Sequence, residues 1–152
     1  MSFKVFISYA TEDMQFVEQV RQVLVSSSID VFVAEHSVLP GQSLSSEIIA
    51  AIKSCDLFVL LWSKNSQSSE WVPQEIGIAR AAEKPIIPLI LEPGLQAPGL
   101  IKDIKYLSIY DGPEKSLAWL QQHVVERKQS KQTEDFWRVL VVIGALYLFF
   151  RK

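Results

Sequence analysis

Short apolar runs recur along the first 110 residues, and each is followed by a segment with a different pattern. Five such runs lie at residues 3–8, 30–33, 56–63, 85–91 and 105–109, and most are rich in Val, Ile, Leu and Phe. Runs of this length and composition are typical of buried strands. The run DLFVLLWS at 56–63 is almost wholly apolar, which predicts a central strand covered on both faces.

Segments with a helical period separate these runs. Apolar residues fall on one helical face after the first run, at Phe16, Val17, Val20, Val23 and Leu24. Further helices are predicted at residues 47–54, from Ser69 to about Glu83, and at 114–125. The alternation predicts an α/β fold within residues 1–125: a flavodoxin-like five-stranded parallel sheet of order 2-1-3-4-5, with helices on both faces.

The end of the chain has a different character. Residues 126–135 are wholly polar and are interpreted as a linker, and residues 136–152 form an apolar C-terminal helix. About fifteen residues between Asp135 and Arg151 reach only ~22 Å, against ~30 Å of bilayer hydrocarbon. Aromatic residues at both ends of this segment are typical of a membrane interface. Two interpretations stay open: a short anchor that contacts a membrane through residues 136–150, and a helix that packs in an assembly.

Composition narrows the classes of function. From Glu126 onward there are six Lys/Arg and three Asp/Glu (net +3), whereas the rest has nine and fourteen (net −5). An acidic body argues against nucleic acid as a partner, because phosphates require a basic face. Cys55 is the only cysteine, so neither an intrachain disulfide nor a cysteine zinc site is expected. The N-terminus does not resemble a signal peptide, so we expect a cytoplasmic domain, attached to the inner face of a membrane if the tail is an anchor.

The predicted sheet indicates where a ligand would bind. Ligands of such folds lie beyond the carboxyl ends of the strands, where the strand order reverses. The loops at that point are residues 8–13 and 63–71, and the loop around Pro40-Gly41 flanks the same edge.

The helix that follows the second of these loops carries a carboxylate. Ser69 or Ser68 is a suitable N-cap, and Pro73 must lie in the first turn, so Glu75 is predicted in the second turn, facing the crevice. Trp71 and Glu75 are four residues apart and share a face. On these residues alone, Trp71 is more simply a core residue and Glu75 a solvated one. His36 and His123 are the only histidines and lie far apart in sequence, which gives little support to a Ser-His catalytic site.

Several motifs together resemble a known family. The stretches FISYATED, VLPGQSLSSEI, DLFVLLWSKNSQSSEW and WVPQE occur in the order and spacing of the Toll/interleukin-1 receptor (TIR) domain, over about residues 1–125. The chain resembles in particular compact prokaryotic TIR proteins that cleave NAD. The resemblance implies the flavodoxin-like fold, and cleavage of the bond between nicotinamide and ribose, with NAD as substrate and with no cofactor or metal.

The same resemblance suggests residue roles. The family pattern S-x-W-x-x-x-E matches Ser69, Trp71 and Glu75, which makes Glu75 the catalytic residue. The remaining substrate-binding positions that it implies are Ser8, Tyr9, Ala10, Leu39 and Gly41. Bacterial members often have an acidic residue directly after the second strand. Here Ala34 occupies that place and Glu35 follows. The resemblance therefore does not indicate which contacts the loop after the second strand makes.

One carboxylate can suffice for this chemistry. The leaving nicotinamide already carries a positive charge and departs neutral, so no general acid is needed, and a fixed anion can stabilise or trap the ribosyl cation. The resemblance implies a NAD glycohydrolase or ADP-ribosyl cyclase, activated by self-assembly through TIR–TIR contacts, in a defence or cell-death response. The main alternative is a non-catalytic signalling adaptor. A nucleoside deoxyribosyltransferase and a phosphoacceptor receiver domain are further alternatives with less support.

Overall fold

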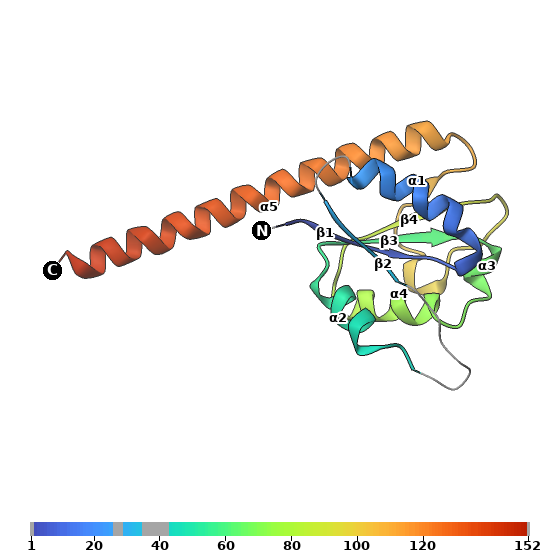
Figure 1. The fold of residues 1–152 in the computed structure, drawn as a ribbon, viewed down its shortest axis with the longest axis horizontal. Coiled ribbons are helices and arrows are strands. Elements are labelled where there is room, and N and C mark those ends of the chain that lie inside the picture. The colour runs from blue at the N-terminus through green and yellow to red at the C-terminus, as the bar shows by residue number, and fades with distance from the viewer. Residues whose placement is uncertain (1, 26–28, 35–42, 152) are drawn as a thin grey trace.

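The computed structural model describes residues 2–25, 29–34 and 43–151, and a five-stranded parallel sheet forms its centre (Figure 1). The strand order is β2-β1-β3-β4-β5, which confirms the predicted fold class. All four neighbouring pairs are parallel. The strands are β1 (Lys4–Ser8), β2 (Asp30–Val33), β3 (Leu57–Trp62), β4 (Ile86–Ile90) and β5 (Leu107–Ser108).

Helices cover both faces of this sheet, as predicted. In Figure 1, α1 and α5 lie over one face, whereas α2 and α4 lie over the other. The described helices are α1 (Met14–Val25), α2 (Ser46–Ser54), α3 (Lys64–Gln67), α4 (Val72–Ala81) and α5 (Pro113–Phe150), with short 3₁₀ turns η1 (Thr11–Asp13) and η2 (Gly99–Ile101).

Strand β3 joins the two halves of the core. Its six residues are all buried, and successive side chains point to opposite faces of the sheet. Leu57, Val59 and Leu61 belong to the core beneath α1 and α5. The alternate side chains Phe58, Leu60 and Trp62 belong to the core beneath α2 and α4. The prediction of a central strand covered on both faces is therefore confirmed.

Several predicted boundaries are wrong, and two of them lie in the segments that follow β3 and β5. Residues 64–67 lie in a segment predicted to be a loop, but they form the short helix α3, in which Ser63 Oγ accepts a hydrogen bond from the backbone N–H of Ser66. The last helix does not end at residue 125. It continues through the polar residues 126–135 into the apolar residues, so that α5 is one helix of 38 residues. The polar segment is thus helical, because Glu, Arg, Lys and Gln are all good helix formers.

Helix α5 crosses the sheet from its carboxyl edge to its amino edge. Near its start, Ser116 Oγ donates a hydrogen bond to the carbonyl of Ser108, at the end of β5. Lys131 lies at the opposite edge, where its Nζ donates to the Ser2 carbonyl (3.1 Å) and pairs with Asp56 Oδ2 (2.8 Å), just before β1 and β3. The rest of α5 extends beyond the body as a rod (Figure 1). Within the described residues, no helix combines the length and the apolar character that crossing a membrane requires.

Leu61 and Leu148 provide a matched test of this core. Leu61 is fully buried in β3, whereas Leu148 on the rod is 63% exposed. We expect Leu61→Ala to lower the free energy of unfolding by ~2–5 kcal/mol, because it removes buried methyl groups and leaves a cavity. Leu148→Ala should change that free energy by less than ~0.5 kcal/mol. Urea unfolding followed by circular dichroism measures both, and equal losses would contradict this description of the core.

Candidate active site

Glu75 is a fully buried carboxylate at the carboxyl edge of the sheet. Its side chain has no exposed surface, and Oε1 accepts a hydrogen bond of 3.0 Å from Ser8 Oγ. Ser8, the last residue of β1, is fully buried too. Burial of a charged group is costly unless polar partners offset the loss of water, and the Ser8 hydroxyl is one such partner. The topology therefore brings together two predicted residues that are 67 positions apart.

The start of α4 places Glu75 differently from the prediction. The helix begins at Val72, three residues later than Ser69, so Glu75 lies in its first turn and not in its second. Pro73 lies in the first turn, as predicted. Ser69 still contributes to this helix start, because its Oγ accepts hydrogen bonds from the backbone N–H groups of Trp71 (3.2 Å) and Val72 (3.3 Å).

A pocket of about 230 Å³ opens beside this pair, between the loop after β1 and the segment before α4. It brings together four predicted site residues: Tyr9, Ala10, Ser69 and Trp71. The other lining residues are Thr11, Glu12, Asn65 and Ser68. Predicted positions Leu39 and Gly41 lie outside the described residues.

Glu75 is fully buried and is not among the described residues that line this pocket. It follows the lining residue Trp71 by one helical turn, and its partner Ser8 directly precedes the lining residue Tyr9. The sequence predicts that Glu75 faces the crevice; in the structure its side chain is fully buried, and its role in the site stays a prediction. Tyr9, Ala10 and Trp71 line the pocket, and the fully buried Glu75 has no exposed surface in it.

A second buried carboxylate holds the two site loops together, and sequence reasoning missed it. Asp13 is 4% exposed; its Oδ2 accepts a hydrogen bond from Ser63 Oγ and its Oδ1 accepts one of 3.0 Å from Asn65 Nδ2. Ser66 extends the network by donating from Oγ to the Leu61 carbonyl (2.6 Å). These contacts join the segment after β1 to the segment after β3. One feature of the sequence does indicate these residues: Asp13 and Ser63 lie in the two predicted loops that meet where the strand order reverses.

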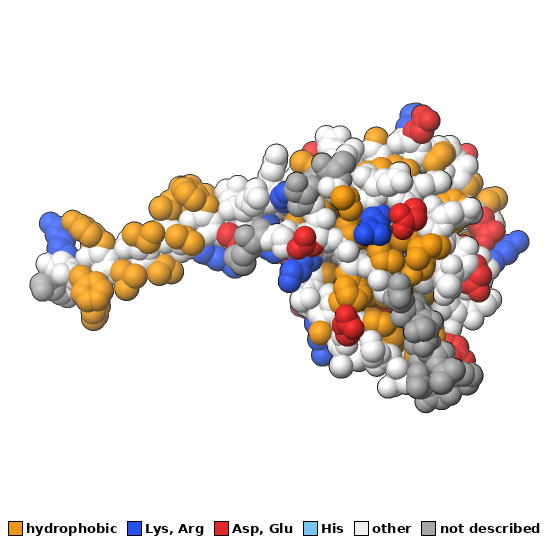
Figure 2. Space-filling model, in the orientation of Figure 1, with side chains coloured by type: hydrophobic (Ala, Val, Ile, Leu, Met, Phe, Trp, Pro, Cys, Tyr) orange, Lys and Arg blue, Asp and Glu red, His pale blue; other side chains and the backbone are white. Residues whose placement is uncertain are grey.

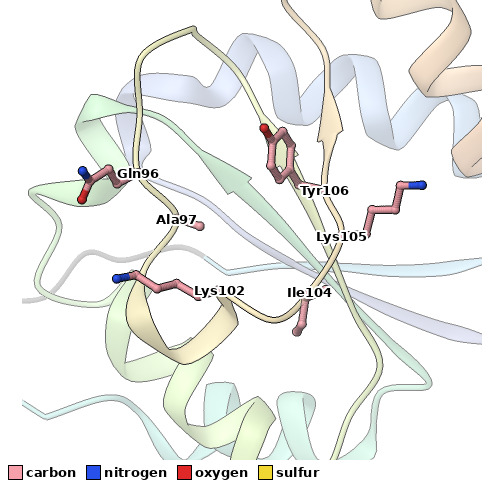
Figure 3. A pocket seen from close by; sticks show the side chains of 6 residues that line it. All are labelled: Gln96, Ala97, Lys102, Ile104, Lys105 and Tyr106. Carbon is pink, nitrogen blue, oxygen red and sulfur yellow. The ribbon is translucent and has the colours of Figure 1, made fainter.

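A wider hollow lies elsewhere, between the segment after β4 and the start of β5. It measures about 610 Å³, and its lining includes Lys102, Lys105 and Tyr106. Figure 3 shows that the amino groups of the two lysines point in opposite directions, so they do not converge on one anion. Trp62 Nε1 fixes the rim by donating to the Gln96 carbonyl (3.0 Å). This hollow therefore lacks the converging polar groups that mark a ligand site.

The chemistry of the site is that of a positioned carboxylate. Among residues 2–25, 29–34 and 43–151, no cluster of His, Cys, Asp and Glu side chains suits a metal ion. A carboxylate fixed in an apolar environment stabilises positive charge strongly, because little water screens it. The hydroxyl of Ser8 holds one carboxylate oxygen in place. The arrangement suits the stabilisation of a cationic transition state or the trapping of a cationic intermediate.

Comparisons with known proteins agree with this architecture. Residues 5–124 match the family model of the TIR domain. The TIR domain of the Toll-related receptor TRR-2 from Hydra magnipapillata is 22% identical, with a TM-score of 0.64, over 79% of this chain and 96% of that one. The CMP N-glycosidase BcmB from Clostridium botulinum is 24% identical, with a TM-score of 0.54, over 77% and 97%. The TIR domains of the activated Roq1 resistosome are 21% identical, with a TM-score of 0.52, over 84% of each chain.

The contribution of Asp13 can be tested against that of its neighbour. Asp13→Ala leaves the buried Ser63 hydroxyl and the Asn65 amide without their carboxylate acceptor, so we expect the free energy of unfolding to fall by ~1–3 kcal/mol. Glu12→Ala removes an exposed carboxylate one residue earlier and should change it by less than ~0.5 kcal/mol. Urea unfolding gives both values. Equal stability of the two variants would show that the network does not join the loops.

Proposed function

Since this chain belongs to the TIR domain family, we propose that it cleaves the bond between nicotinamide and ribose in NAD, with Glu75 as the catalytic carboxylate. The observation that carries the proposal is the hydrogen bond between a fully buried Glu75 and Ser8, which is next in the chain to Tyr9, a residue that lines a polar pocket. In a parallel sheet this edge is where ligands bind. Glu75 also completes the S-x-W-x-x-x-E pattern with Ser69 and Trp71.

The proposed step needs one carboxylate. The C–N bond to nicotinamide breaks, its electron pair goes to the ring nitrogen, and neutral nicotinamide departs. The positive charge left on the ribosyl group is stabilised by the Glu75 carboxylate, or trapped by it as a covalent ester. Water then gives ADP-ribose, whereas attack from within the same molecule gives a cyclic product. Ser8 is the residue that holds the carboxylate in position.

In the single chain the candidate site is small and Glu75 is buried, and activation by self-assembly would account for both properties. A pocket of about 230 Å³ is smaller than the ~300–1,000 Å³ typical of small-molecule sites, and Glu75 is closed off from it. We infer that contact with a second copy moves the pocket wall and supplies the remaining surface for the substrate. A role as a switch in a defence or cell-death response is consistent with such activation.

The burial of Glu75 also favours a second candidate function. If Glu75 always remains buried, Glu75 and Ser8 are a buried polar pair that stabilises the fold. The domain would then act as a non-catalytic adaptor, through assembly with other TIR domains. The two functions differ in one measurable property: an adaptor forms oligomers without any turnover of NAD.

The role of Glu75 is tested by Glu75→Gln. The glutamine keeps the shape and an oxygen that can accept from Ser8, so the variant should fold, but it lacks the negative charge. We expect release of nicotinamide from NAD, measured by chromatography, to fall at least ~100-fold. Glu70→Gln, an exposed neutralisation near the start of the same helix, is the control and should retain activity. Undiminished turnover by Glu75→Gln would refute the assignment.

Activation by assembly gives a separate prediction. We expect the rate of nicotinamide release per molecule to rise with protein concentration, in parallel with oligomer size measured by light scattering. CMP is tested as a second substrate by chromatography of the released cytosine, because the N-glycosidase from Clostridium botulinum shares the fold. A constant rate per molecule while the oligomers grow would contradict activation by assembly. Oligomers without turnover at any concentration would favour the adaptor.

A further inference from the structure

The outer end of α5 is apolar on every side. Twelve large apolar side chains between residues 136 and 150 are 41–77% exposed. They are Phe136, Trp137, Val139, Leu140, Val141, Val142, Ile143, Leu146, Tyr147, Leu148, Phe149 and Phe150. The five consecutive residues 139–143 alone cover more than one full turn of 3.6 residues, so no side of the helix is polar there. We refer to residues 136–150 as the apolar tip; Figure 2 shows its hydrophobic side chains gathered on the protruding rod.

We propose that the apolar tip inserts into a lipid bilayer, and that α5 then holds the candidate active site on the side of the body facing away from the membrane. This inference goes beyond the proposed function and does not depend on it. A helix that is apolar all round requires an apolar environment all round, and a bilayer provides one.

The charges beside the tip fit a lipid surface. From Glu126 onward the chain has a net charge of +3, and Arg138 and Arg151 bracket twelve uncharged residues. Anionic lipid headgroups attract such basic residues. The twelve residues span ~18 Å, which is less than the ~30 Å of hydrocarbon. The proposal is therefore one of insertion and not of crossing, and the long arginine side chains can extend toward the headgroups.

A second copy of the chain fits the tip less well. A helical partner covers one side only, and two helices would leave the opposite sides of both in water. Coiled coils continue an apolar seam over at least three or four heptads, but the tip provides about two. The preceding residues 126–135 are all polar and cannot extend the seam toward the body.

The orientation follows from the contacts of α5 with the body. Ser116 is bonded to the end of β5, at the carboxyl edge, and Lys131 is bonded to Ser2 and Asp56 at the amino edge. The tip therefore leaves the body from the amino edge. The pocket residues lie at the carboxyl edge, on the opposite side of the sheet. With the tip in a bilayer, the pocket faces the aqueous phase.

Vesicle flotation with the full chain tests the insertion. In neutral phosphatidylcholine vesicles we expect the chain to float, and Val142→Asp to lower the partition coefficient ~100-fold, because a charge then lies at the centre of the apolar tip. Gln132→Asp, an exposed change on the polar part of the same helix, should remain within about twofold. Added phosphatidylglycerol should increase binding, and salt should reverse that increase.

Two outcomes would overturn the insertion. In the first outcome, the chain does not float, it forms oligomers without lipid, and Val142→Asp dissociates them. A second copy of the chain, and not a bilayer, would then cover the apolar tip. If Val142→Asp floats as well as the unsubstituted chain, attachment lies elsewhere. Neither measurement involves NAD, so this inference and the proposed function fail independently.

Labelling tests the orientation. Cys55 is buried, so a single added cysteine takes up a fluorescent dye selectively. We use Glu70→Cys, exposed beside the pocket, and Leu148→Cys in the tip. Lipids that carry a quencher should extinguish the dye at position 148 and leave the dye at position 70 unchanged. Equal quenching at both positions would show that the pocket faces the membrane, which would refute the orientation.

Discussion

The structure depends on one constraint: six consecutive apolar residues of β3 must be removed from water on both faces of the sheet. A strand of this kind is stable only if other strands flank it and helices cover it above and below. The helix pairs α1 with α5 and α2 with α4 meet that requirement. Because the helices connect parallel strands, each strand must end in a loop at the same edge. The polar residues of the chain converge there as a result, and Ser8, Ser63 and Asp13 occupy the ends of strands or the turns that follow them.

Much of this arrangement could be predicted, because it follows from local patterns. The strand at residues 30–33 and the central strand are visible as apolar runs, and the strand order follows from the general behaviour of alternating strands and helices. Helix boundaries were harder to predict. The helix α3 is held by side-chain hydrogen bonds of Ser63 and Ser66, and four residues are too few to show a hydrophobic period. In residues 126–135 polarity suggested a linker, although the residues themselves favour a helix.

The sequence predicts several residues of the candidate site, but it does not predict whether their side chains are buried or open to solvent. The sequence motifs identify Ser8, Trp71 and Glu75, and the topology accounts for their proximity. That Glu75 is closed off depends on contacts between segments more than sixty residues apart, which no local pattern reveals. The network around Asp13 is similar, since it joins the segment after β1 to the segment after β3. One buried carboxylate thus stabilises the architecture of the site, and the other is proposed to perform its chemistry.

The continuous helix α5 has a consequence for changes in chain length. Each residue added to a helix turns everything beyond it by about 100°. Between Ser116 and Lys131, one inserted residue would rotate one anchoring side chain away from its partner, so this part of α5 cannot vary in length. Beyond Lys131 the same insertion would rotate a tip whose residues 139–143 present apolar side chains in every direction. The outer half of the helix can therefore gain or lose residues in evolution, whereas the inner half is fixed in register.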